Sequence, residues 1–235
     1  MTTTDAIFSR LQLISDEKTA STLRWFFKTG PGEYGEGDLF RGIRVPQLRM
    51  ICREFSHASV DDAGRLLASS WHEDRLLGLL LLVERYKMPD EAQRSLIYTR
   101  YCASTDRINN WDLVDLSCPR IVGCHLQERN RLPLYRFALS ESLWERRIAI
   151  VSTFHFIRAG DFHDTLAIAE KLIGDREDLI HKATGWMLRE VGKRDVGALE
   201  GFLSEYYRDM PRTMLRYAIE KLPEPRRQAW LKGLI

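Results

Sequence analysis

The chain has 235 residues, of which 44% are hydrophobic and 29% are charged, a balance typical of a helical protein with a solvated outer face. This length allows one large domain or two small ones with a continuous apolar core. No apolar stretch is long enough to span a membrane, and residues 1–6 lack the features of a secretory signal, so we expect a cytoplasmic protein. The net charge of +2 is nearly balanced and does not by itself indicate a nucleic-acid partner.

The four cysteines form no C-x-x-C pair and, without an export signal, are expected to be reduced thiols. Cys118 and the pair Cys124-His125 offer metal-binding atoms, but no second cluster completes a tetrahedral set. We therefore expect neither a metal site nor another cofactor.

Apolar residues recur at helical spacing in runs separated by turn-forming residues such as Pro89 and Gly160. In chain order the predicted helices are residues 5–14, 16–28, 46–56, 61–70, 71–87, 90–103, 109–125, 130–140, 142–158, 161–173, 176–193, 195–208, 211–221 and 225–233. No run alternates with period two, so the sequence predicts an all-α protein.

Residues 29–42 interrupt the helical pattern, because five of the chain's fifteen glycines lie between Gly30 and Gly42. The segment must be a long structured loop, and it lacks the glycine and lysine spacing of a P-loop. One interpretation is a folded surface loop packed by Tyr34, Leu39 and Phe40. The other is a binding loop, since three arginines are close by: Arg41, Arg44 and Arg49.

Five residues begin successive apolar helical runs at intervals of 36, 36, 35 and 34 residues: Arg75, Trp111, Arg147, Lys182 and Arg216. Such a period predicts stacked helical hairpins. We expect one repeat domain over residues 1–235, with N-terminal helices and the Gly-rich loop in about 1–60 and tandem hairpins in about 61–235. Stacking would place equivalent residues of successive repeats side by side on one concave surface.

Four residues that are candidates for a functional site follow this period. Trp111 and Asp115 lie one helical turn apart on one face, Arg147 follows Trp111 by one repeat, and Trp186 follows Asp115 by two. The phasing indicates that the four side chains border a common cleft.

Taken singly, each of these residues has another explanation. Trp111 is large enough to be a core residue, Asp115 in a first helical turn complements the helix dipole, and Arg147 can pair with a nearby acid. Arg75, Lys182 and Arg216 fit a generic repeat surface.

Five longer segments carry a family resemblance: residues 26–35 (FFKTGPGEYG), 38–49 (DLFRGIRVPQLR), 110–115 (NWDLVD), 144–149 (WERRIA) and 182–190 (KATGWMLRE). With these segments the chain resembles the AlkD-like DNA alkylation repair enzymes, helical-repeat DNA glycosylases. The resemblance covers roughly residues 5–230. It implies a HEAT-like solenoid whose concave face binds DNA.

The resemblance also implies roles for particular residues. Asp115 would be the catalytic carboxylate, Trp111 and Trp186 the cleft tryptophans, and Arg147, or its neighbour Arg146, the phosphate-binding arginine. The other expected DNA contacts are Arg44, Lys182, Arg189, Lys193, Arg212 and Arg216. Residues 182–235 contain eleven Lys or Arg and seven Asp or Glu, an excess that fits such contacts and that a solvated helical surface explains equally well.

The implied reaction is hydrolysis of the N-glycosidic bond of a purine alkylated at N3 or N7, in double-stranded DNA, by a monomeric enzyme associated with the nucleoid. Such a base is already cationic and leaves without a general acid. The family is expected to engage the nucleotide from its backbone side, without a deep base pocket. The alternatives are a non-catalytic helical-repeat scaffold that binds a protein, and a DNA-binding array without glycosylase activity.

Overall fold

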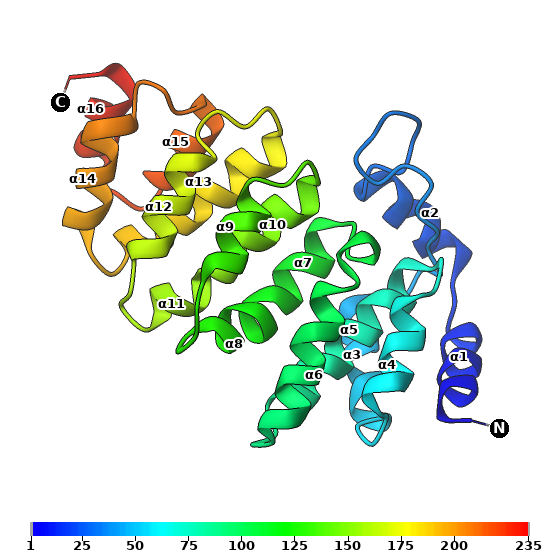
Figure 1. Ribbon diagram of the computed structural model, residues 1–235. Helices are drawn as coiled ribbons and strands as arrows, with labels where there is room; N and C mark the ends of the chain where they lie inside the picture. The colour runs from blue at the N-terminus through cyan, green and yellow to red at the C-terminus, as the bar shows by residue number, and fades with distance from the viewer. Residues whose placement is uncertain (1, 235) are drawn as a thin grey trace. The chain divides into compact units, whose positions relative to one another are not determined.

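The computed structural model describes residues 2–234, and none of these residues forms a strand; an isolated bridge joins Leu39 and Trp71 (Figure 1). The all-α prediction is therefore confirmed. None of the described helices combines the length and apolar character that crossing a membrane requires. The chain divides into two compact units, Met1–Ser117 and Cys118–Ile235, and each is described on its own.

The first unit is built around α5, which is buried along most of its length because α3, α4 and α6 pack against it. Side chains cap several helix starts, including Asp16 before α2 and Ser59 before α4. The helices of this unit are α1 (Thr3–Leu13), α2 (Glu17–Phe26), α3 (Val45–Glu54), α4 (Val60–Leu67), α5 (His72–Tyr86), α6 (Glu91–Cys102), the 3₁₀ turn η1 (Thr105–Arg107) and α7 (Trp111–Cys118).

The second unit is arranged around α13, which contacts α10, α12, α14 and α15. Its elements are the π-helical turn η2 (Pro119–Gly123), α8 (Cys124–Leu126), α9 (Leu132–Ala138), α10 (Leu143–Ser152), α11 (Phe154–Arg158), α12 (His163–Lys171), α13 (Asp178–Gly192), α14 (Val196–Tyr206), α15 (Arg212–Ala218) and α16 (Glu224–Lys232).

The repeat period corresponds to real helices, since its five leading residues all lie within the first five positions of α5, α7, α10, α13 and α15. In the second unit, α10 packs beside α13 and α13 beside α15, so equivalent helices of successive repeats are neighbours there. Glycine permits the closest of these approaches. A Cβ atom on Gly185 would lie 2.4 Å from the carbonyl oxygen of Met214.

Two predicted helices are interrupted. The run 109–125 contains Pro119, which lacks an N–H donor and shifts the hydrogen bonding into the π-helical turn after α7. The run 142–158 breaks between α10 and α11 at Thr153, whose hydroxyl donates to the carbonyl oxygen of Ile150 at 2.6 Å.

Candidate functional site

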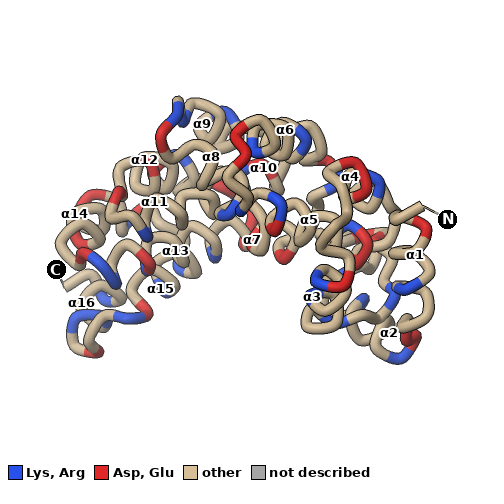
Figure 2. Tube along the Cα trace, turned by 90° about the horizontal axis from the view of Figure 1, so that it is seen from below, with Lys and Arg blue, Asp and Glu red and all other residues tan. Residues whose placement is uncertain are grey.

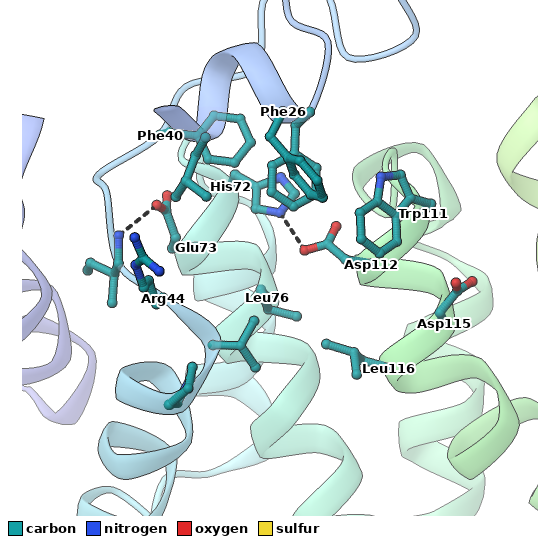
Figure 3. Close-up of a pocket in the computed structure, with 15 residues that line it drawn as sticks. Phe26, Phe40, Arg44, His72, Glu73, Leu76, Trp111, Asp112, Asp115 and Leu116 are labelled. Carbon is teal, nitrogen blue, oxygen red and sulfur yellow. Dashed lines mark hydrogen bonds and ion pairs between the residues drawn. The ribbon is translucent and has the colours of Figure 1, made fainter. Parts of the chain in front are cut away.

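The first unit contains an apolar cavity of about 400 Å³ between α2, the start of α3, α5 and α7. Aromatic side chains dominate its upper wall, including Phe26 and Phe40, while Trp111 and Asp115 of α7 line another side (Figure 3). The resemblance implied an open face without a deep pocket. A cavity of this size beside Trp111 is therefore a feature that the sequence did not indicate.

Trp111, the first residue of α7, is half-buried by two consecutive phenylalanines. Phe27 stacks on the indole with centroids 5.3 Å apart, and Phe26 meets it edge-on at 5.9 Å. Trp111 thus packs against the core cluster of Ala20, Phe27 and Phe40 and still contributes a face to the cavity. Trp111 is therefore partly a core residue, and its role in a functional site stays a prediction.

Asp115 is half-buried one turn further along α7 and also lines the cavity. The predicted four-residue spacing therefore does bring Trp111 and Asp115 to one side of α7 (Figure 3). Asp112, between them in sequence, also lines the cavity and turns its carboxylate toward His72 (Figure 3). Its carboxylate accepts a hydrogen bond from the backbone N–H of Leu113 and contacts His72.

His72, at the start of α5, joins this wall to the Gly-rich loop. Its Nε2 lies 2.9 Å from Oδ2 of Asp112, and its Nδ1 lies 2.8 Å from Oδ2 of Asp38. The imidazole is 2% exposed and stacks on Phe40 with centroids 4.4 Å apart. Two carboxylates and an aromatic face surround the ring, which is an environment for a charged imidazolium.

The protonation of His72 follows from opposing effects. Burial alone would lower the pKa of His72, but the carboxylates of Asp112 and Asp38 outweigh it and raise the pKa to about 9. Burial would raise the pKa of Asp38, but the neighbouring His72 and Arg75 outweigh it and hold the pKa of Asp38 below its usual value. The pair is therefore ionised near neutral pH.

The first turn of α5 anchors the Gly-rich loop through four consecutive residues, beginning with His72. Glu73 accepts hydrogen bonds from the backbone N–H groups of Arg41, Gly42 and Ile43, at 2.8 to 3.0 Å. Asp74 binds the guanidinium of Arg41 through both carboxylate oxygens, at 2.6 and 2.9 Å. These bonds fix the end of the loop against the helix that carries His72.

The prediction that Arg75 lies on a generic repeat surface is wrong. Arg75 is 3% exposed, and its Nη2 donates to Oδ1 of Asp38 at 2.7 Å and to Asn109 at 3.0 Å. Its partners lie 34 and 37 residues away, so helical periodicity carries no information about them. The available signal was four polar residues in succession, His72 to Arg75, directly before the apolar run of α5.

The Gly-rich loop folds back on itself. The carboxylates of Glu33 and Glu36 accept hydrogen bonds from the backbone N–H groups of Gly30 and Gly32, at 2.8 and 3.0 Å. Phe40 is buried as expected of a packed loop, whereas Leu39 is 44% exposed. Two amides that a phosphate could have used are therefore occupied.

The remaining predicted site residues lie in the second unit. Trp186 of α13 is half-buried, with its ring 5.9 Å from that of Phe154. Arg147 of α10 is 6% exposed, and its Nη1 donates to the carbonyl oxygen of Leu179 at 2.6 Å. That these two residues border one cleft with Trp111 and Asp115 stays a prediction.

The predicted DNA-binding cations differ in whether an ion pair within the protein engages them. Arg146 is bound by Asp175 at 2.6 Å, Lys182 by Asp178 at 2.7 Å, Arg189 by Glu220, and Lys193 by Glu190. Arg44, Arg212 and Arg216 are exposed, and no ion pair holds any of them within residues 2–234. Lys and Arg occur on α13, α15 and α16 of the second unit (Figure 2).

Together these features define an all-α helical-repeat protein whose first unit has an aromatic cavity with a carboxylate in its wall. The sequence profile of the DNA alkylation repair enzyme family matches residues 7–222. The chain therefore belongs to the DNA alkylation repair enzyme family, and it is an enzyme of DNA repair whose partner is DNA.

A solved structure gives the same fold. It is described as a predicted DNA alkylation repair enzyme from Enterococcus faecalis, and it superposes with a TM-score of 0.70 at 16% sequence identity. The match covers 89% of this chain and 97% of the other. Comparison with curated proteins gives no match.

Proposed function

We propose that this protein is a DNA glycosylase that hydrolyses the N-glycosidic bond of purines alkylated at N3 or N7 in double-stranded DNA. The observation that carries the proposal is the position of Asp115, a half-buried carboxylate in the wall of an aromatic cavity beside Trp111. Low polarity around a carboxylate strengthens its attraction for a developing cation.

The reaction needs no metal or acid from the protein. When the bond between C1′ and the base nitrogen breaks, its electron pair neutralises the positive charge of the alkylated base, which leaves as a neutral molecule. The sugar acquires the charge as an oxocarbenium ion. Water then bonds to C1′ and loses a proton, and in the proposal Asp115 orients that water.

The electrostatic stabilisation of the sugar cation by a carboxylate is large enough to accelerate the reaction substantially. A negative charge about 4 Å from the sugar cation contributes about 4 kcal/mol at an effective dielectric constant near 20. This corresponds to roughly a thousandfold in rate. The face of Trp111 adds about 0.5–2 kcal/mol if a cation approaches it. In the proposal, Trp186 supplies a second aromatic face and Arg147 holds a phosphate.

A single substitution tests the role of Asp115. Asparagine has the same shape without the charge, so Asp115→Asn should lower the single-turnover rate of 7-methylguanine release by about a thousandfold while the protein still binds DNA. The control is Asp209→Asn, which neutralises an exposed acid outside the site. Equal release by Asp115→Asn and wild type would contradict the catalytic assignment.

The same assay distinguishes an active glycosylase from a non-catalytic scaffold. A scaffold would bind DNA or a protein and release no base, and its affinity for damaged DNA would not depend on Asp115. Release of free base by the wild type excludes it.

A further inference from the structure

The last turn of α2 presents two large aromatic side chains to solvent. Trp25 is 75% exposed and Phe26 is 51% exposed, and they are the only exposed Trp or Phe in the part of the chain that the structure describes. They are also adjacent in sequence. Adjacent aromatics left in water commonly mark a binding surface.

The chain directly after these aromatics is strained. Lys28 has φ of 57°, and among residues 2–234 it is the one residue other than glycine in the left-handed region. It ends α2 in a Schellman arrangement, since the N–H of Thr29 donates to the carbonyl of Arg24 and that of Lys28 to Trp25. Glycine is the residue that this position normally favours.

The strained backbone places a cation beside the exposed indole. Nζ of Lys28 lies 5.5 Å from the ring centroid of Trp25 and 3.9 Å from a carboxylate oxygen of Glu33. The Lys28 side chain is 48% exposed, so Glu33 leaves its ammonium open to a second anion. A glycine here would relax the backbone but would remove this charge.

The aromatic pair is continuous with the cavity. Phe26 lines the cavity that Asp115 also lines, and its ring meets Trp111 edge-on at 5.9 Å (Figure 3). Trp25 precedes Phe26 in the same helical turn. A ligand that reaches Asp115 at this wall therefore passes close to the end of α2.

We propose that Trp25 and Lys28 form a contact for damaged double-stranded DNA beside the cavity, in which Trp25 stacks on a base that is unpaired at the lesion and Lys28 binds a flanking phosphate. The inference rests on the proposed function. Nucleic acid fits better than a protein segment because an indole face and a neighbouring cation match a base and its phosphate. Stacking tolerates any base, which suits a site that recognises damage rather than sequence.

Binding measurements distinguish stacking by Trp25 from phosphate binding by Lys28. The probe is a duplex with a tetrahydrofuran abasic analogue and 2-aminopurine opposite it, compared with an intact duplex across a range of salt concentrations. Trp25→Ala should weaken binding to the abasic duplex by about 5–100-fold without changing the salt slope, and should abolish the quenching of 2-aminopurine. Leu139→Ala, which removes a side chain that is 73% exposed, is the matched control.

Variants of Lys28 test the cation and the strain together. Lys28→Gly should raise the melting temperature by about 2–4 °C while lowering the salt slope by about one unit, and Lys28→Arg should restore the slope. If Trp25→Ala binds the abasic duplex and quenches 2-aminopurine as the wild type does, the contact is excluded. If the wild type binds through Trp25 yet releases no 7-methylguanine, the contact stands and the glycosylase proposal fails.

Discussion

At the scale of single residues, the buried His72 joins the Gly-rich loop to α7 through a hydrogen bond at each ring nitrogen. The imidazolium is held between Asp38 and Asp112, and Arg75 binds the second oxygen of Asp38. Asp112 lies next to Trp111 and one turn before Asp115. His72 is therefore a positioning residue for the α7 wall of the cavity.

This arrangement predicts a pH dependence of stability. The pKa of His72 is raised from 6.5 to about 9 in the folded protein, so its contribution is complete below about pH 6.5 and is lost as the pH rises through about 9. The contribution is about 3 kcal/mol at most. We expect the free energy of unfolding of the wild type to fall between pH 6.5 and 9, and that of His72→Gln to be lower and to change less.

Urea unfolding at several pH values measures this effect. His57→Gln, which alters an exposed histidine, should follow the wild type. Parallel pH profiles for wild type and His72→Gln would show that His72 is not charged in the folded state.

The residue scale also shows what the sequence could reveal about the site. Trp111 and Asp115 were predictable as a pair because both lie on one helix at a spacing of four. His72, Asp38 and Asp112 were not, because each hydrogen bond joins residues at least 34 positions apart through a loop with no periodicity. Local spacing does not encode such contacts.

At the scale of helices, hydrophobic periodicity predicted the positions of most helices. It did not predict the interruptions after α7 and between α10 and α11. Pro119 could have indicated the end of α7, since proline disrupts helical hydrogen bonding. Thr153 is an unremarkable helix residue in sequence, and its bond to Ile150 becomes visible only in the folded chain.

The packing of α13 on α15 predicts opposite effects for two glycine substitutions. In Gly185→Ala the new Cβ would lie 2.4 Å from the carbonyl oxygen of Met214, so the variant should lose about 1–3 kcal/mol of stability. In Gly201→Ala of α14 the Cβ meets no atom within 4 Å, and the better helix propensity should add about 0.5–1 kcal/mol.

Thermal or urea unfolding of the two variants measures the difference. A stabilising effect of Gly185→Ala would mean that α13 and α15 do not approach as closely as described.

At the scale of the molecule, binding to DNA depends on cations that are free to meet phosphate. Arg216 is exposed and has no ion-pair partner in the described chain, whereas Arg146 is held by Asp175 and by the carbonyls of Ser140 and Glu141. Arg216→Ala should weaken binding to damaged and intact duplexes equally and lower the salt slope by about one unit.

Arg146→Ala should instead reduce stability, because it leaves the Asp175 carboxylate, whose side chain is 5% exposed, without its cationic partner. Fluorescence anisotropy at increasing salt, together with unfolding curves, distinguishes these effects. An unchanged salt slope for Arg216→Ala would remove this residue from the DNA-binding surface.

The central claim is that this member of the DNA alkylation repair enzyme family breaks the glycosidic bond itself. Its most direct test is analysis of the products from a duplex with a single 7-methylguanine. The account predicts free 7-methylguanine and a strand that stays intact until heat or alkali cleaves it at the abasic site. Recovery of the modified base still attached to the strand, under conditions where the duplex is fully bound, would contradict the account.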